Sequence, residues 1–233
     1  MPTPPPDPRH QLLATILARK PKLHYWPAHG GWSFGGFDDR HLKLIFTTLT
    51  AALPPESHTT LETGAGLSTL IFLATRPLRH VCIAPDEALR DRVLQQVDEF
   101  GLAGDRLEFV TRRSEEVLPA LTETAAPFLD AALIDGGHGF PTPFVDFCYI
   151  NRALKQGGGL FVDDTQLYSV RQLTDLLTEQ PGWKTLTATG KLSVFHKQHA
   201  LRYLPDFGEQ PFVKRQSHLP GAAPVRQELP ADG

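Results

Sequence analysis

Cysteine and methionine are scarce in this chain, and long apolar runs are absent. Its 233 residues include 2 cysteines and 1 methionine, which is too few thiols for a disulfide-stabilised secreted domain. Cys82 and Cys148 both lie in apolar stretches, so we expect buried free thiols. No segment approaches the ~20 consecutive apolar residues of a membrane span, and the first residues lack the basic-then-apolar order of a secretory signal. We therefore expect a cytoplasmic protein with no membrane partner.

An excess of charge of either sign is also missing. The 23 basic and 26 acidic residues leave a formal net charge of −3 at pH 7. Because binding to a phosphate backbone depends on clustered positive charge, we expect no nucleic-acid partner. The hydrophobic fraction of 41 % is typical of a globular protein with a sizeable core.

Composition divides the chain into four stretches. The predicted divisions are a disordered proline-rich tail (1–8), N-terminal helices with an aromatic, glycine-rich loop (9–57), a main domain (58–200) and an irregular C-terminal tail (201–233). Helical patterns at 11–20 and 39–52 flank the loop at 24–37. This loop suggests a lid over a ligand, and it also fits a segment that only fixes the helices to the core.

From residue 58 onward, short β-type runs alternate with helical patterns. This alternation predicts an α/β fold with a doubly wound, mostly parallel sheet of seven strands, whose ligand lies beyond the carboxyl ends of the strands. The last two runs are joined by Thr189-Gly190, which reads as a hairpin and makes the last strand antiparallel. The predicted strands are TTLET (59–63), HVCIA (80–84), RLEFV (106–110), LDAALID (129–135), GLFVDD (159–164), WKTLTA (183–188) and KLSVFHK (191–197). The predicted helices are 67–75, 87–99, 114–122, 142–154 and 167–178. The helix at 142–154 is expected to carry Asp146 and Asn151 on its polar side.

The first strand of the main domain runs directly into a glycine-rich turn, ETGAG at 62–66. Glycine at 64 and 66 lets the backbone approach a ligand, and the helix beyond offers unpaired N–H groups. The turn therefore predicts a nucleotide-like ligand, although a tight strand-to-helix turn favours glycine without one. Glu62, an acid at the end of a buried strand, is a candidate acceptor of a ligand hydrogen bond. Thr69 stands where a dinucleotide fingerprint has its third glycine, which leaves a NAD(P)-dependent oxidoreductase as the alternative.

Three motifs resemble, in order and spacing, those of class I S-adenosylmethionine-dependent methyltransferases: LETGAGLST (61–69), LIDGGH (133–138) and LKQGGGLFVDD (154–164). The IDG-x-H loop is similar to that of the small-molecule branch, the metal-assisted O-methyltransferases of sugars and catechols. The resemblance covers about residues 58–198 and implies a Rossmann-like domain that binds S-adenosylmethionine. It also implies transfer of a methyl group to an oxygen of a small-molecule acceptor, with nitrogen as the weaker candidate.

The resemblance assigns roles to individual residues. Asp135 would face the sulfonium or a metal. His138 matches the loop histidine that acts as a general base in some relatives, and an ordinary pKa of about 6.5 suits that task; a histidine that only bonds its own turn is the alternative. The implied cofactor-binding residues are Glu62, Gly64, Ala65, Gly66, Ser68, Thr69, Asp86, Ser114 and Asp135.

Two positions depart from the family pattern. Ala84 ends the second strand, where an acid usually binds both ribose hydroxyls, and Asp86 is the nearest substitute. Arg113 follows the third strand, where an acid often receives the adenine amine, and Ser114 is the nearest candidate there. These departures leave open a methyltransferase-like binding module without turnover.

Asp135, Asp163 and Asp164 end two adjacent predicted strands, so their carboxylates are expected to lie close together. Carboxylates are the ligands that Mg²⁺ prefers, and such an ion would lower the pKa of an acceptor hydroxyl. Asp164 is also placed to cap the following helix. Without a metal, Asp135 would hydrogen-bond the cofactor or acceptor and His138 would take the proton alone. The sequence does not identify the acceptor, and it leaves a homodimer open.

Overall fold

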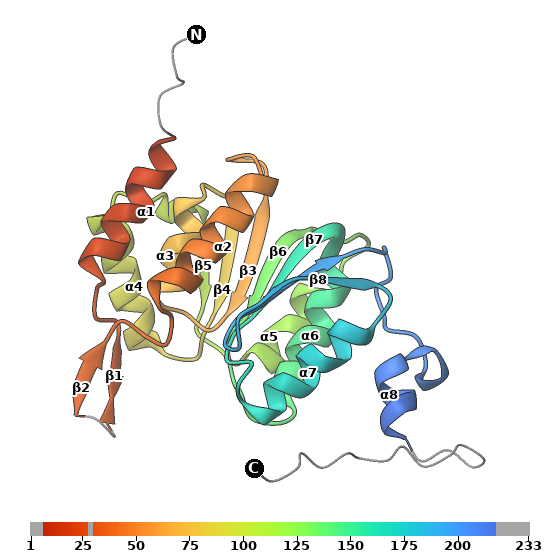
Figure 1. The fold of residues 1–233 in the computed structure, drawn as a ribbon. Coiled ribbons are helices and arrows are strands. Elements are labelled where there is room, and N and C mark those ends of the chain that lie inside the picture. The colour runs from red at the N-terminus through yellow and green to blue at the C-terminus, as the bar shows by residue number, and fades with distance from the viewer. Residues whose placement is uncertain (1–6, 28–29, 218–233) are drawn as a thin grey trace.

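The structure, a computed structural model, describes residues 7–27 and 30–217 and is built around a sheet of seven strands (Figure 1). The strands are β3 (Thr59–Thr63), β4 (Arg79–Ile83), β5 (Leu107–Val110), β6 (Leu129–Ile134), β7 (Leu154–Val162), β8 (Trp183–Ala188) and β9 (Ser193–Lys197). Across the sheet their order is β5-β4-β3-β6-β7-β9-β8. Most of the predicted proline-rich tail and the last part of the predicted C-terminal tail lie outside the described residues.

The strand directions follow the doubly wound pattern. Strands β3 to β7 pair in parallel, and β9 pairs antiparallel with both β7 and β8. This arrangement confirms the predicted fold class, an α/β protein with a mostly parallel seven-stranded sheet and an antiparallel last strand. Because β3 pairs with β4 on one side and β6 on the other, the winding reverses there, and a ligand is expected above the carboxyl ends of these strands.

Helices cover both faces of the sheet. They are α1 (Pro8–Arg19), α2 (Asp39–Ala52), α3 (Leu67–Ala74), α4 (Glu87–Glu99), α5 (Ser114–Leu121), α6 (Thr142–Ala153), α7 (Tyr168–Glu179) and α8 (Pro211–Gln216), with short 3-10 turns at Gly104–Arg106 and Phe207–Glu209. One apolar cluster draws on α1 to α4 and the other on α5 to α7 (Figure 1). Along β6, Ala131 and Leu133 enter the first cluster while Ala132 and Ile134 enter the second, because successive side chains of a strand point to opposite faces.

Side-chain caps explain why two helices begin where the sequence predicts. Asp38 accepts the N–H of His41 at 2.9 Å at the start of α2, and Asp86 accepts the N–H of Leu89 at 2.9 Å at the start of α4. A capping carboxylate satisfies a backbone donor that the helix leaves unpaired. The bounds of both helices coincide with the predicted ones.

Two short regions of secondary structure were not predicted. Strands β1 (His24–Trp26) and β2 (Gly31–Ser33) pair antiparallel within the aromatic loop. Helix α8 lies in the stretch that was expected to be irregular, and an ion pair between Arg215 and Glu179 connects it to α7. Elements of three to six residues are too short to show a periodic apolar pattern.

Burial differs from expectation on α6. Asp146 and Asn151, expected on the polar side, are buried, whereas Cys148 is exposed. Apolar residues lie on most faces of this helix, so periodicity does not fix which side meets the sheet and its neighbouring helices. Cys82 is buried as expected, and both thiols are free. Among the described residues, no helix combines the length and apolar character that crossing a bilayer requires.

Candidate active site

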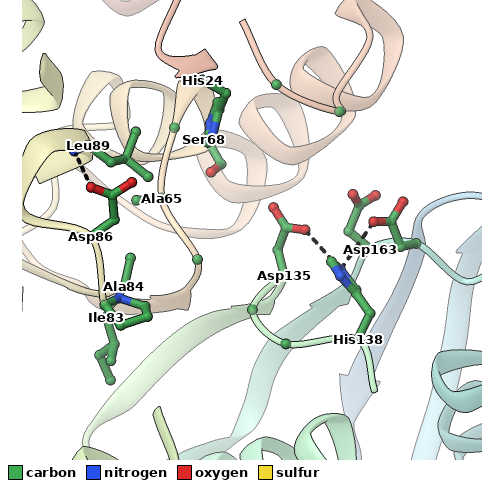
Figure 2. Close-up of a pocket in the computed structure, with 18 of the residues that line it drawn as sticks. His24, Ala65, Ser68, Ile83, Ala84, Asp86, Leu89, Asp135, His138 and Asp163 are labelled. Atoms are coloured by element: carbon green, nitrogen blue, oxygen red, sulfur yellow. Dashed lines mark hydrogen bonds and ion pairs between the residues drawn. The ribbon is translucent and has the colours of Figure 1, made fainter. Parts of the chain in front are cut away.

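A cavity of about 460 Å³ opens above the carboxyl ends of β3, β4, β6 and β7 (Figure 2). It lies where the strand order reverses, as expected for a doubly wound sheet. The segment between α1 and α2 closes one side of it. The lining includes residues 64–68, 83–86, 113–115, 135–138 and 163–164.

The two glycines of the turn after β3 leave no room for a side chain. Gly64 has a φ of 92°, and a Cβ there would lie 2.2 Å from the carbonyl oxygen of Asp135. A Cβ at Gly66 would lie 2.7 Å from Nε2 of His24. Only glycine fits these contacts, which bring the turn against the loop after β6 on one side and the aromatic loop on the other.

Seven of the nine residues implied to bind the cofactor line this cavity: Gly64, Ala65, Gly66, Ser68, Asp86, Ser114 and Asp135. Glu62 and Thr69 do not, which corrects their expected placement. Both are fully buried beneath the turn, where Thr69 Oγ1 accepts the N–H of Gly66 at 3.1 Å and donates to a carboxylate oxygen of Glu62. The imidazole of His80 lies 3.2 Å from the same carboxylate. These residues therefore support the turn from below.

The residues after β4 form the wall of the cavity that lies opposite Asp135 and His138 (Figure 2). Ala84 is buried and offers no polar atom of its own side chain. Asp86 uses Oδ1 to cap α4, and its Oδ2 lies 3.9 Å from the guanidinium of Arg92. The capping role fixes the Asp86 carboxylate at the rim, and its second oxygen is placed to meet a polar ligand group.

Asp146 is buried below the cavity floor, next to Gly136 and Ser114. A Cβ at Gly136 would lie 3.4 Å from its Oδ2. Burial raises the pKa of Asp146 to about 6, and the hydroxyls of Ser114 and Thr63 offset this rise only in part. Keeping this carboxyl group charged at neutral pH therefore costs free energy of folding. Its burial was not predicted from the sequence, where Asp146 was expected on the polar face of the helix.

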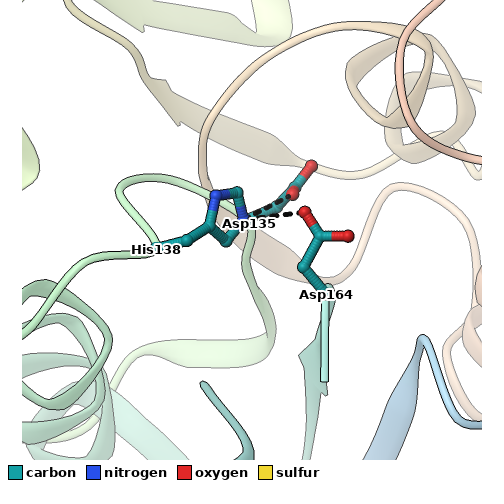
Figure 3. A group of neighbouring side chains, drawn as sticks. All are labelled: Asp135, His138 and Asp164. Atoms are coloured by element: carbon teal, nitrogen blue, oxygen red, sulfur yellow. Dashed lines mark ion pairs between the residues drawn. The ribbon is translucent and has the colours of Figure 1, made fainter. Parts of the chain in front are cut away.

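Asp135, His138 and Asp164 line the cavity, and their side chains point toward one another (Figure 3). Nε2 of His138 lies 3.1 Å from Oδ2 of Asp164 and 3.6 Å from Oδ1 of Asp135. Burial raises the pKa of Asp135 to about 7, and hydrogen bonding to Asp135 raises the pKa of His138. Asp135 and His138 therefore titrate as a coupled pair. Burial raises the pKa of Asp164, but hydrogen bonds from Lys191 and Gln166 outweigh it and hold that pKa below its ordinary value.

Asp163 does not join this group, although the sequence analysis placed it in the metal-binding set. Only 2 % of its side chain is exposed, and it accepts a hydrogen bond from Nζ of Lys191 at 2.7 Å. Lys191 also donates to Oδ1 of Asp164. A Mg²⁺ site needs several free oxygens around one point, and here Lys191 engages one oxygen of Asp163 and one of Asp164. Asp135, His138 and Asp164 each offer a ligand atom, and these atoms lie within 4.8 Å of one another. The Mg²⁺ site of Asp135, Asp163 and Asp164 stays a prediction.

Sequence reasoning missed Lys191 because only the sheet topology brings it here. Val162 at the end of β7 pairs with Ser193 at the start of β9. The residue two positions before β9 therefore lies beside the two aspartates that follow β7. Nothing in the local sequence KLSVFHK marks this lysine, and the order of the last strands is the signal that would have found it.

The aromatic loop contributes four side chains to the cavity: His24, Trp26, Phe34 and Phe37. Burial lowers the pKa of His24, and the nearby Arg92 lowers it further, so the ring is neutral at physiological pH. The sequence analysis described the loop and did not single out His24. That this loop acts as a lid stays a prediction.

Comparisons with known proteins agree on the domain type. A family model described as a methyltransferase domain matches residues 61–165. The O-methyltransferase TomG from Streptomyces achromogenes, involved in tomaymycin synthesis and solved in complex with SAM, has a TM-score of 0.63 and 16 % identity, covering 79 % of this chain and 90 % of its own. Cofactor-bound Rv0187 from MTB has a TM-score of 0.59 and 16 % identity, covering 85 % of this chain and 99 % of its own.

A third solved structure is of the same kind. The O-methyltransferase from Bacillus cereus, in complex with SAH, has a TM-score of 0.58 and 16 % identity, covering 84 % of this chain and 93 % of its own. At these identities the likeness shows a shared fold, and a fold alone does not fix the acceptor. No curated protein matches this chain.

Proposed function

We propose, from the match of residues 61–165 to a family model described as a methyltransferase domain, that this protein transfers the methyl group of S-adenosylmethionine to an oxygen of a small molecule. The observation that carries the proposal is one cavity that joins the glycine-rich turn to the pair Asp135 and His138. A cofactor site and a candidate base therefore open onto the same space.

The cavity walls suit the parts of S-adenosylmethionine. Gly64 and Gly66 leave bare backbone toward the cavity, next to the N-terminal end of α3, where unpaired N–H groups attract a carboxylate such as that of a methionine moiety. Ala84 and Leu89 offer an apolar surface for an adenine ring, and Ser114 offers a hydroxyl to its edge. The outer oxygen of Asp86 would receive a ribose hydroxyl.

Bound S-adenosylmethionine supplies a methyl group on positively charged sulfur, and transfer forms the acceptor oxygen–carbon bond while the sulfur–carbon bond breaks with its electron pair left on sulfur. The protein must align the acceptor, exclude water and remove the proton of the acceptor hydroxyl. Nε2 of His138 is buried between two carboxylates although 32 % of the side chain is exposed. Nδ1, the ring nitrogen that faces neither carboxylate, is the one proposed to accept that proton, and Asp135 and Asp164 stabilise the imidazolium that forms.

Asp135 has a second effect on the reaction. It follows β6 and lies directly beside Gly64, so its side chain reaches the cavity at the point where the methionine end of the cofactor would meet the acceptor. Its carboxyl group is placed there to orient either the cofactor amine or the acceptor hydroxyl.

The acceptor is proposed to be small because the cavity must hold both molecules. Its volume of about 460 Å³ lies toward the lower end of ligand pockets. Trp26 and Phe34 cover one side of it with aromatic surface, which suits a planar or sugar-like molecule. Nitrogen remains the weaker candidate for the accepting atom.

Calorimetric titration of the full chain with S-adenosylhomocysteine tests the proposal first. We expect one site per chain, and loss of binding in Gly64→Ala, because the added Cβ would strike the Asp135 carbonyl. Gly208→Ala is the matched control, since a Cβ there meets nothing within 4 Å. Release of S-adenosylhomocysteine with a panel of hydroxylated small molecules then identifies the acceptor. Absence of binding to the wild type at millimolar ligand, or preferential binding of NADH, would overturn the proposal.

A further inference from the structure

A lysine ammonium lies among the carboxylates of the candidate active site. Nζ of Lys191 forms hydrogen-bonded ion pairs with the carboxylates of both Asp163 and Asp164, and 23 % of the lysine side chain is exposed. We propose that Lys191 is the resident cation of this site, which takes the place of a divalent metal and donates a hydrogen bond to the acceptor oxygen. The inference rests on the proposed function and adds a catalytic residue and a metal-independent reaction to it.

The ammonium engages two of the three aspartates that were predicted to bind a metal. Asp164 binds Lys191 through Oδ1 and His138 through Oδ2. Asp163 binds Lys191 through Oδ2 and keeps Oδ1 buried, without a partner among residues 7–27 and 30–217. A divalent ion at these oxygens would have to displace the ammonium or lie against it, and two positive charges in a half-buried site repel strongly.

The position of Lys191 is fixed from three sides. Its carbonyl oxygen accepts the N–H of Thr165 at 2.9 Å, which ties the β8–β9 hairpin to the segment after β7. Its ammonium lies 5.5 Å above the ring of Phe37, a favourable cation–π contact. A Cβ at Gly36 would lie 3.6 Å from Nζ. Gly36 and Phe37 line the cavity, as do Asp163 and Asp164, so the ammonium lies directly behind residues of the cavity wall.

The ammonium has one donor left for a ligand. A lysine carries three N–H bonds, and within the described part of the chain Nζ uses two of them, toward Asp163 and Asp164. An acceptor hydroxyl that gives its proton to His138 develops negative charge on oxygen. A fixed donor aimed at that oxygen stabilises the charge without any metal. The site therefore favours an acceptor oxygen over a neutral amine nitrogen, which develops no negative charge.

Binding of Mn²⁺ alone, followed by electron paramagnetic resonance on the full chain, tests the inference without any substrate. We expect no stoichiometric site in the wild type up to about 1 mM Mn²⁺, the weak end of protein sites for divalent cations. Lys191→Gln leaves Asp163 and Asp164 without their ammonium and is expected to gain affinity for Mn²⁺ by at least about tenfold. Lys191→Arg keeps the charge and is expected to behave as wild type. Lys184→Gln, on the exposed side of β8, is the matched control.

A wild type that binds one Mn²⁺ tightly, with binding abolished in Asp164→Asn, would overturn the inference. The titration of the wild type needs no variant, so a Lys191 variant that fails to fold leaves the test intact. S-adenosylhomocysteine binding is measured on the same samples. If S-adenosylhomocysteine binds and Mn²⁺ also binds, only this inference fails; if S-adenosylhomocysteine does not bind, the proposed function fails whatever Mn²⁺ does.

Turnover gives the second readout. With the acceptor found in the panel, methyl transfer is expected to be unchanged by excess EDTA. Lys191→Gln is expected to lower kcat by about 10²- to 10³-fold, the usual effect of removing one donor to a developing oxyanion, with the affinity for S-adenosylhomocysteine unchanged. Lys191→Arg is expected to recover part of the rate. Inactivation by EDTA that added Mg²⁺ reverses, or full activity of Lys191→Gln, would contradict the role assigned to Lys191.

Discussion

His138 is the residue on which the proposed proton transfer depends. Its Nε2 edge faces Asp135 and Asp164, and these carboxylates raise its pKa above the ordinary value. A stronger base is a better acceptor of the hydroxyl proton, but it is available only at a pH above that raised pKa. The geometry of one imidazole between two carboxylates therefore sets both the rate and its pH dependence.

We predict that His138→Gln lowers kcat by about 10²- to 10⁴-fold, the usual contribution of a general base, with the affinity for S-adenosylhomocysteine unchanged. In the wild type, kcat should fall as the pH drops through the raised pKa of His138, because the protonated imidazole accepts no proton. The measurement is a pH profile of methyl transfer, with His199→Gln, an exposed histidine, as control. A variant with wild-type kcat and the same acid limb would rule out His138 as the base.

Asp146 gives a prediction about stability. Burial raises its pKa in the folded chain to about 6, against about 3.9 for an unfolded chain. The charged form is therefore disfavoured by folding: its cost is absent below about pH 4, grows between about pH 4 and 6, and is full above that range. Asp146→Asn removes the charge and should raise the free energy of unfolding by about 2–3 kcal/mol at neutral pH and by almost nothing near pH 4.

Urea denaturation at the two pH values measures this difference. Asp105→Asn, at an exposed position, is the control for a lost surface charge. A variant that is less stable than wild type at neutral pH would show that the Asp146 carboxylate is needed in its charged form.

At the scale of elements, the turn between β3 and α3 is held from both sides. Above it lie the Asp135 carbonyl and His24, and below it Thr69 links the N–H of Gly66 to the buried Glu62. Such a buried polar network orders the backbone only while every member keeps its partner. The turn geometry that the cofactor would meet therefore depends on side chains that do not touch the cofactor.

We predict that Thr69→Val weakens S-adenosylhomocysteine binding and destabilises the fold by about 1–3 kcal/mol, because in a buried site it removes the partner of the Gly66 N–H and leaves Glu62 with His80 alone. Thr47→Val, whose hydroxyl is exposed on α2, should change neither. Calorimetry and urea denaturation give the two quantities. Unchanged affinity in a folded Thr69→Val protein would show that this network does not shape the site.

Element identity was the part of the structure most accessible from sequence. Strong apolar runs and acidic caps fixed the seven strands and the starts of α2 and α4, since both signals act locally. The burial of α6 and the placement of Glu62 and Thr69 were misjudged, because each depends on which face of an element meets its neighbours. Those contacts arise only when the whole sheet has formed.

For the whole molecule, the site is assembled from segments far apart in sequence. Three of its residues follow parallel strands: Gly64 after β3, Asp135 after β6 and Asp164 after β7. Their motifs predicted that they belong to the site, because the carboxyl ends of parallel strands meet at one edge of the sheet. Lys191 and His24 were not predicted from the sequence. Lys191 reaches the site because the antiparallel strand β9 pairs with β7, and His24 because the N-terminal aromatic loop closes one side of the cavity. Motif spacing thus predicts the site residues that follow the parallel strands, and it misses those that the antiparallel strand and the N-terminal loop contribute.

Ligand binding at such a site should stabilise the entire chain. At a concentration of about 100 times its Kd, a ligand that binds only the folded state adds about 2.7 kcal/mol, which corresponds to a rise in Tm of about 5–10 °C for a chain of this size. We predict a rise of this order with S-adenosylhomocysteine and none with adenosine 5′-monophosphate at the same concentration. Scanning calorimetry measures it, and equal shifts with both ligands would indicate a site that recognises only the nucleoside.

The most direct test of the account is a crystal structure of the full chain with S-adenosylhomocysteine bound. We predict that its sulfur lies above the turn at Gly64 and Gly66, that its ribose faces Asp86, and that the space between the sulfur and His138 is open to an acceptor. Electron density for the ligand at any other place, or a cavity filled by the protein's own side chains at saturating ligand, would contradict the proposal that this cavity is the methyl-transfer site.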